Sequence, residues 1–206
     1  RSISPIASNP TFASPSSEEL LRIIYIDVGQ GDSALILTPD GKSMLIDAGE
    51  SASEEKVAEV LEQYGVTFID MLIATHPHSD HIGGMKYIVE NFQIGQFCLP
   101  NVAHTSQTYE ELLLAVQQKK IPTLQAKAGV SFQLGDDVSC SVLAPASDSY
   151  ESLNDYSVVL HLSYGSTSFL FTGDAEALSE FEILASSSAS PEADVLKVGH
   201  QDRKSV

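Results

Sequence analysis

Positive charge is scarce in this sequence. It has 11 lysine and arginine residues against 28 aspartates and glutamates, which gives a net charge of −17. Binding to nucleic acid or to anionic lipid through phosphates depends on lysine and arginine. The composition therefore disfavours nonspecific binding to long DNA or to a membrane surface. It leaves room for a phosphate-containing substrate, because bound metal ions would supply local positive charge.

Cysteine and long apolar segments are also in short supply. The two cysteines, Cys98 and Cys140, are too few for a disulfide-rich scaffold. Both lie in strand-like segments, so we expect buried free thiols, with a single bridge as the alternative. No apolar run approaches the roughly 20 residues of a membrane helix, so we expect no membrane span in this chain. A length of 206 residues suffices for one domain with a sizeable core.

The first 19 residues are rich in serine and proline and lack apolar periodicity. Such a composition is typical of a flexible leader or linker. We therefore predict a leader at 1–19 and one globular domain at 20–206. A tether of this kind fits an exported protein, so we expect an extracellular or cell-surface location, with a cytoplasmic location as the alternative.

Strand and helix signals alternate along the globular part. The first three strands, separated by short turns, predict an antiparallel meander. Capping-box spacing at Ser51 and Glu54, and at Thr108 and Glu111, indicates two helix starts. The order of elements favours two packed sheets with helices outside. The predicted strands span 21–28, 33–38, 43–47, 68–74, 94–99, 123–127, 138–143, 157–163, 168–172 and 195–198, and the helices 54–64, 109–119, 176–184 and a segment from about 81.

The segment from His76 to His81 places four side chains of metal-ligand type within six residues. Imidazole and carboxylate are ligands of zinc, manganese and iron. His76 and His78 alternate in an extended segment and can point to one side. Asp80 and His81 follow a turn and can reach a second ion. The spacing predicts two adjacent divalent metals, zinc or manganese, which suit the hydrolysis of phosphoesters or acyl compounds.

Three further residues of ligand type lie at the ends of apolar strands. They are Asp47 in Leu-Ile-Asp-Ala-Gly, Asp174 in Phe-Thr-Gly-Asp and His200 in Lys-Val-Gly-His. Loops that leave strand ends are where open α/β folds build their sites. Taken alone, Asp47 would serve equally well as a helix or turn cap. Together with the histidine segment, the three indicate one site.

These motifs resemble those of the metallo-β-lactamase superfamily of hydrolases. Thr-His-Pro-His-Ser-Asp-His matches its HxHxDH signature, and Ile-Asp-Ala-Gly, Thr-Gly-Asp and Val-Gly-His match three of its other motifs. The opening Asp-Val-Gly-Gln-Gly-Asp is similar to the hydrolase domain of ComEC-like competence proteins, which act in DNA uptake, and to phosphorylcholine esterases. The resemblance covers about residues 22–200. It implies an α/β fold, a four-layer αββα sandwich.

The resemblance also implies a role for each residue. A hydroxide between two metals would attack phosphorus or a carbonyl carbon. Catalysis would rest on His78, Asp80 and Asp174, with Asp80 orienting the water or handling its proton. The implied ligands are His76 and His78 for the first metal, Asp80, His81 and His200 for the second, Asp174 between the two, and Asp47 behind them as support.

Two departures from the family pattern matter. Many members place a third histidine just before a Ser-Val-Val-Leu-like strand, but residues 151–157 contain none. Asp155, Asn154 or water would then complete the first site. His104 and His161 are alternatives, although we expect a loop position for His104 and a packed strand position for His161.

The second departure is the end of the chain, six residues after His200. We expect the second sheet to lack its last C-terminal elements, because the protein is naturally short or its coding sequence is interrupted. A missing element would leave an exposed sheet edge, which favours pairing with another copy.

The sequence therefore predicts a metal-dependent hydrolase, a phosphodiesterase or nuclease, acting on a phosphoester or another small hydrolysable substrate. One alternative is an acyl hydrolase such as a lactonase, thioesterase or β-lactamase. The other is a module that keeps the metal fold and binds a partner without turnover.

Overall fold

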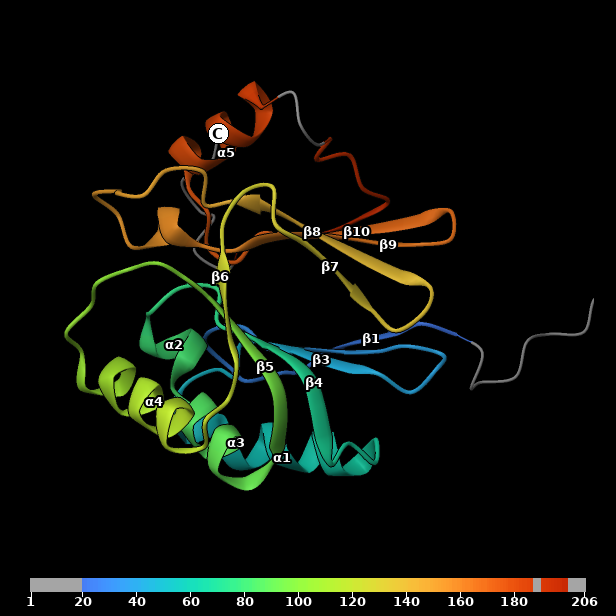
Figure 1. The fold of residues 1–206 in the computed structure, drawn as a ribbon, viewed down its shortest axis with the longest axis vertical. Helices are drawn as coiled ribbons and strands as arrows, with labels where there is room; N and C mark the ends of the chain where they lie inside the picture. The colour runs from blue at the N-terminus through green and yellow to red at the C-terminus, as the bar shows by residue number, and fades with distance from the viewer. Residues whose placement is uncertain (1–19, 187–189, 200–206) are drawn as a thin grey trace, which may run out of the picture.

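Two β-sheets pack face to face, and helices cover the outer face of each (Figure 1). The computed structural model describes residues 20–186 and 190–199. The predicted leader at 1–19 and the predicted ligand His200 lie outside the described residues. Helices, sheet, sheet and helix form four successive layers, so the predicted α/β sandwich is confirmed.

Each sheet is built from one continuous half of the chain. Sheet A comes first and sheet B second, and strand neighbours within each sheet are consecutive along the sequence. Sheet A contains β1 (Arg22–Tyr25), β2 (Ala34–Leu37), β3 (Ser43–Ile46), β4 (Phe68–Ile73), β5 (Gln93–Pro100) and β6 (Thr123–Ala126). Sheet B contains β7 (Ser131–Leu134), β8 (Val138–Ala144), β9 (Val159–Tyr164), β10 (Thr167–Phe171) and β11 (Val195–Lys197).

The pairing mode changes once within each sheet, from antiparallel to parallel. β1, β2 and β3 form the predicted antiparallel meander, and β3 to β6 then run parallel. In sheet B, β7 to β10 are antiparallel and β11 joins β10 in parallel. The parallel strands are connected by helices, as crossover geometry requires.

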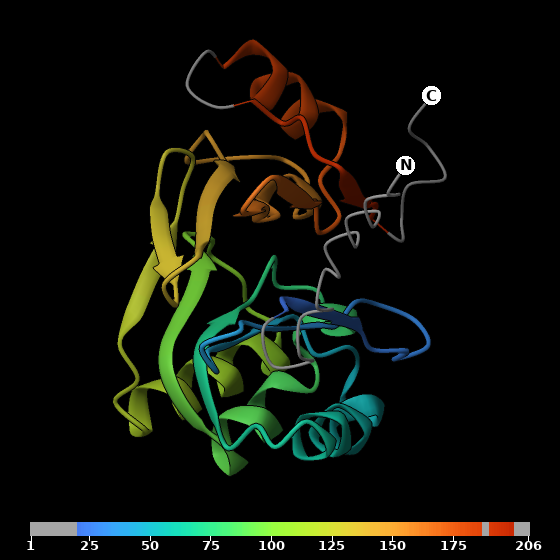
Figure 2. The same cartoon turned by 90° about the vertical axis from the view of Figure 1, so that its right-hand side faces the viewer.

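The helices divide between the two outer faces, and Figure 2 shows α5 on the side away from the others. A single turn of 3-10 helix precedes α1 and another precedes β9. The helices over sheet A are α1 (Glu54–Gln63), α2 (Ser79–Ile82), α3 (Met85–Asn91) and α4 (Gln107–Gln118); α5 (Ala177–Ala185) covers sheet B, and the 3-10 turns are η1 (Ser51–Ser53) and η2 (Asn154–Tyr156).

Sheet A is apolar on both faces because it is covered on both. Successive side chains of a strand point to opposite faces. Leu45 packs in the cluster beneath the helices, whereas its neighbours Met44 and Ile46 pack in the cluster between the sheets. Continuous apolar runs such as Met71-Leu72-Ile73 follow from this arrangement. On the far side of sheet B, Ile183 of α5 packs on Leu143 and Val159.

The structure corrects two predicted elements. Residues 131–134 form β7, a strand that was not predicted, because the four residues Ser-Phe-Gln-Leu carry little periodicity. The helix predicted from about residue 81 is two helices, α2 and α3, separated by Gly83 and Gly84. A Cβ on Gly83 would lie 2.4 Å from the carbonyl oxygen of Ser79, so glycine permits the close packing there.

Both predicted capping boxes are wrong. Ser51 lies in η1, and no side-chain cap is present at Ser53, the residue before α1. α4 begins one residue earlier than Thr108, and its cap is the extended residue Ser106, whose hydroxyl accepts a bond from the Tyr109 N–H at 3.3 Å. The capping residue must lie just outside the helix with extended dihedrals, and Thr108 is already helical.

Replacing Ser106 with alanine should therefore lower the free energy of unfolding by about 1 kcal/mol, the usual cost of losing an N-cap. Thr108→Ala is the matched control, and it should be neutral or slightly stabilising because alanine has the higher helix propensity. Urea unfolding of the two variants measures the difference. Equal losses in both would show that the Ser106 hydroxyl does not cap α4.

Three further predictions concern the two cysteine thiols, a membrane-spanning segment and the edge of sheet B. Cys98 and Cys140 are free and buried, as expected, and burial raises the pKa of each thiol to about 12. Among the described residues, no helix has the length and hydrophobicity needed to cross a bilayer. β11 forms one edge of sheet B in the described part of the chain, and Leu196 on it is exposed. Pairing of that edge with another copy stays a prediction.

Candidate metal centre

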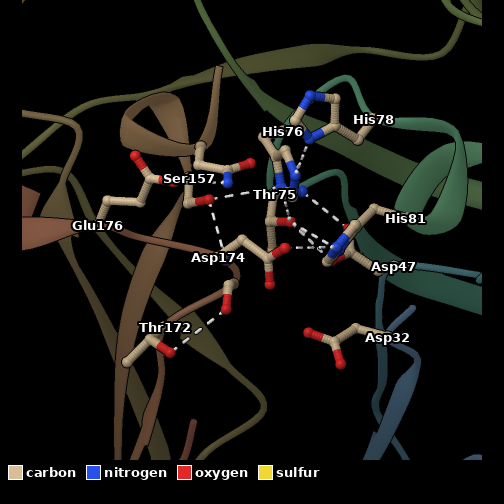
Figure 3. Close-up of polar contacts among 12 residues, drawn as sticks. Asp32, Asp47, Thr75, His76, His78, His81, Ser157, Thr172, Asp174 and Glu176 are labelled. Carbon is tan, nitrogen blue, oxygen red and sulfur yellow. Dashed lines mark hydrogen bonds and ion pairs between the residues drawn. The ribbon is translucent and has the colours of Figure 1, made fainter. Parts of the chain in front are cut away.

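The ligand-type side chains gather where loops from the two sheets meet (Figure 3). Asp47 follows β3, the histidine segment follows β4, and Asp174 follows β10. β3 and β4 are parallel neighbours, so the loops at their carboxyl ends emerge side by side. Asp174 lies on the loop after β10 of sheet B, so it reaches these loops from the other sheet.

Two histidines of the segment meet through their rings. His76 is buried, His78 is half-buried, and His76 Nε2 lies 2.9 Å from His78 Nδ1. The other ring nitrogen of His76 lies 3.0 Å from the Thr75 hydroxyl and 3.4 Å from the Ser157 hydroxyl. The hydroxyls thus hold one side of the His76 ring while its Nε2 faces His78, an arrangement in which both rings can bind one ion.

Asp47 supports the histidine segment from behind. It is fully buried and has a left-handed φ of 55°, a conformation that aspartate tolerates better than most residues. One carboxylate oxygen accepts the Thr75 N–H at 2.8 Å; the other accepts the Thr75 hydroxyl at 2.6 Å and lies 2.7 Å from His81 Nδ1. Asp47 therefore fixes the His81 ring and the start of the segment together, the contacts that its predicted supporting role requires.

Asp174 faces His81 from the other sheet. Its carboxylate is buried, and Oδ2 lies 3.4 Å from His81 Nε2. The Asp174 N–H donates to the Ser157 hydroxyl at 3.1 Å, and the same hydroxyl approaches His76. Gly173 precedes Asp174 with a φ of 51°, and a Cβ there would meet Ser157 and Thr75 at 3.1 Å. The loop is thus packed closely against the histidine segment.

The structure brings some of the predicted ligands together. Ligand atoms of His76, His81 and Asp174 lie within 4.8 Å of one another, as do those of Asp32, Asp47 and His81. His78 joins through its contact with His76. The carboxylate of Asp80 belongs to neither of these groups of described residues, and the roles of Asp80 and His200 stay predictions.

The four residues considered for completing the first site make other contacts in the structure. Asn154 Nδ2 donates to a carboxylate oxygen of Glu176 at 3.0 Å. Asp155 is buried, and its carboxylate accepts the Ser179 N–H at 3.3 Å, so it caps the first turn of α5. His161 lies half-buried on β9 with Nε2 3.0 Å from the Glu192 carbonyl, and His104 stacks edge-on against Tyr109. Both histidines occupy the kinds of position predicted for them.

The donor set fits divalent metal ions. Imidazole nitrogens and carboxylate oxygens are mixed in the proportion that zinc and manganese sites use. Burial alone would lower the pKa of the His81 imidazole, but the carboxylates of Asp47 and Asp174 outweigh it and raise the pKa to about 10. A site that retains a proton so strongly in the metal-free protein has the negative potential that a cation requires.

The raised pKa of His81 predicts a pH-dependent stability in metal-free protein. The charged ring stabilises the fold fully below the unfolded-state pKa of about 6.5, and this contribution is lost as pH rises through the folded pKa of about 10. Melting temperatures across this range should fall more steeply for the wild type than for His81→Gln. His161→Gln is the control and should keep the wild-type slope; equal slopes for wild type and His81→Gln would contradict the assignment.

Three residues of the site were not predicted as such. Thr75 and Ser157 supply the hydroxyls that orient His76, and Asp32 places a carboxylate beside Asp47 and His81. Asp32 carried a signal, since it lies in the Gly-Gln-Gly-Asp segment after β1. Ser157 carried none, because it lies 81 residues from His76 along the chain.

Sequence comparison identifies the relatives of the chain. The family model of the metallo-beta-lactamase superfamily matches residues 26–205. ComE operon protein 3 of Bacillus subtilis is 30% identical over 200 residues, which cover 89% of this chain and 26% of that protein. Recombination protein 2 of Haemophilus influenzae is 30% identical over 193 residues, covering 91% and 22%. The chain thus spans about a quarter of the length of these relatives.

Solved structures share the fold at low sequence identity. Rm3 metallo-beta-lactamase has a TM-score of 0.57 and 14% identity, with 85% of this chain and 74% of that chain covered. A Cronobacter sakazakii metallo-beta-lactamase has a TM-score of 0.52 and 16% identity, with 73% and 59% covered. At such identities the likeness concerns the fold alone.

Proposed function

The chain belongs to the metallo-β-lactamase superfamily, and from that premise we propose that it is a metal-dependent hydrolase that cleaves phosphodiester bonds. One observation carries the proposal: ligand atoms of His76, His81 and Asp174 lie buried within 4.8 Å of one another. The name of one relative, Recombination protein 2, points to nucleic acid as the source of the phosphodiester.

The residues divide into those that would hold metal and those that hold the ligands. His76 and His78 would bind one ion, and His81 and Asp174 the other. Two divalent ions would supply a nucleophile from water at neutral pH and stabilise charge on the phosphate oxygens. The Asp47 carboxylate contacts His81 Nδ1, so the Nε2 atom of His81 faces Asp174. We assign to Asp80 the positioning of the attacking water.

The surface contributes little to holding a charged polymer. Most described lysines are already engaged by carboxylates, and the chain as a whole is strongly acidic. We therefore propose that the substrate is held at the scissile phosphodiester rather than along a nucleic-acid backbone. The lysine ion pairs of the described residues are Lys42–Asp70, Lys56–Asp27, Lys86–Glu111, Lys127–Asp148 and Lys197–Asp32.

Cleavage of a single-stranded oligonucleotide should accordingly depend weakly on salt. A protein that neutralises Z phosphates of a single strand loses affinity with a logarithmic slope of about −0.7Z. We expect a slope between 0 and about −1 for the logarithm of 1/KM against that of salt concentration, which corresponds to about one phosphate contact. A slope of about −3 or steeper would show an extended basic track and contradict this substrate model.

Turnover of bis-p-nitrophenyl phosphate by the zinc- or manganese-loaded chain tests the proposed activity. Activity should appear with metal, vanish with chelator and return on reloading. Thioester, lactone and β-lactam substrates assayed beside it test the acyl alternative. Turnover of these substrates without phosphodiester cleavage would overturn the phosphodiesterase proposal, and metal binding without any turnover would favour a binding module.

A further inference from the structure

Lys197 and Asp32 form the most buried lysine ion pair among the described residues. Lys197 Nζ contacts Asp32 Oδ2, and the two side chains are 18% and 13% exposed. In each of the other four pairs the lysine side chain is at least 42% exposed. Desolvation offsets most of the attraction in a buried ion pair. A role in fixing position accounts for this pair better than a role in stability.

Asp32 rests on both loops of sheet A that carry site residues. Its N–H donates to the Asp80 carbonyl at 3.4 Å, and its own carbonyl accepts the Gly49 N–H at 3.0 Å. A carboxylate oxygen of Asp32 lies within 4.8 Å of ligand atoms of Asp47 and His81. Figure 3 shows Asp32 on the side of the site where Asp47 and His81 lie. A displacement of Asp32 would therefore shift both loops, because its backbone is hydrogen-bonded to each of them.

Lys197 approaches the site from sheet B. It lies on β11, opposite Phe171 of β10. The Lys197 carbonyl accepts the N–H and the hydroxyl of Thr172 at 3.4 and 3.0 Å. Thr172 precedes Asp174 by two residues, and Lys197 precedes the predicted ligand His200 by three. β11 is only three residues long and lies at the sheet edge. The ion pair ties this short strand to the first half of the chain.

We propose that the Asp32–Lys197 ion pair positions the two halves of the metal centre relative to each other; the inference rests on the metal centre of the proposed function. Lys197 reaches across from sheet B to the loop beside Asp47 and His81. It also offsets the charge of a carboxylate that lies next to Asp47. Both are positioning residues, and removing either charge lets the Asp174 loop shift relative to the histidine segment.

Cobalt binding to the whole chain tests the proposal apart from turnover. Cobalt affinity is measured by competition with a chromophoric chelator, and the visible absorption of bound cobalt reports ligand geometry. Lys197→Met and Asp32→Asn should each lower the cobalt affinity by about 10–100-fold, the usual loss when a residue that supports a metal ligand is removed. Each should also change the absorption spectrum of bound cobalt. Lys197→Arg should retain both. The control is Lys86→Met with Glu111→Gln, which removes an exposed pair and should leave both unchanged.

The outcomes separate this inference from the proposed function. No cobalt bound by the wild type would overturn both. Wild-type binding with an unchanged Lys197→Met spectrum and affinity would overturn the ion-pair role alone. A loss in Asp32→Asn without a loss in Lys197→Met would make Asp32 a ligand and overturn it too. If Lys197→Met does not fold, Lys197→Gln takes its place, because it also removes the charge of residue 197 and leaves Asp32 intact.

Discussion

Replacing Asp174 with asparagine should abolish most metal binding and hydrolysis while leaving the fold in place. The Asp174 N–H keeps its bond to the Ser157 hydroxyl, so the loop stays where it is. The side chain, however, loses the charge that faces His81 Nε2 at 3.4 Å. Removing a residue that supports a metal ligand usually costs about 10–100-fold in affinity or activity, and loss of a proposed metal ligand should exceed that range.

Metal content of the purified variant and its turnover of bis-p-nitrophenyl phosphate measure the effect. Asp148→Asn is the matched control: it makes the same chemical change at an exposed aspartate, paired with Lys127, and should leave both quantities unchanged. An Asp174→Asn variant with wild-type metal content and wild-type turnover would remove Asp174 from the proposed centre.

Replacing Gly31 with alanine should destabilise the fold far more than the same change at Gly29. Both glycines have positive φ, 98° and 79°, so both variants carry backbone strain. The two positions differ in the room available for a Cβ atom. A Cβ on Gly31 would lie 1.8 Å from the Asp80 carbonyl oxygen, whereas one on Gly29 would meet nothing within 4 Å.

We expect a loss of unfolding free energy of about 1–2 kcal/mol for Gly29→Ala, from strain alone. Gly31→Ala should lose roughly 3–5 kcal/mol, because the overlap with the backbone adds to the strain. Urea unfolding gives both values, and metal affinity should fall only in Gly31→Ala, where the Asp80 loop must move. Equal losses of unfolding free energy in the two variants would show that the Asp80 loop moves aside at no cost in free energy.

The parts of the site that could be predicted are those with a local pattern. The histidine segment is contiguous, and Asp47 and Asp174 each end an apolar strand beside a glycine. Both strands are apolar because packed layers cover them, so the point where apolar character stops marks the edge of the sheet. That edge is where the structure places the site.

The parts that could not be predicted depend on tertiary contacts. Ser157 is one of many serines until β9 brings its hydroxyl within 3.4 Å of His76 Nδ1. The Lys197–Asp32 pair joins residues 165 positions apart. The error at α4 has a different origin: Ser106 and Thr108 are both capping residue types, and only the backbone dihedrals decide which one lies outside the helix.

The division of the chain into one sheet per half has a consequence for synthesis on the ribosome. All strands of sheet A have been synthesised once residue 126 is added, and their neighbours within the sheet are then all present in the chain. The face with Met44 and Ile46 then stays uncovered until β7 to β10 follow, which takes several seconds at a synthesis rate of about 5–20 residues per second. Nascent chains at that stage present an apolar surface to chaperones, and Asp174 arrives after most of sheet B.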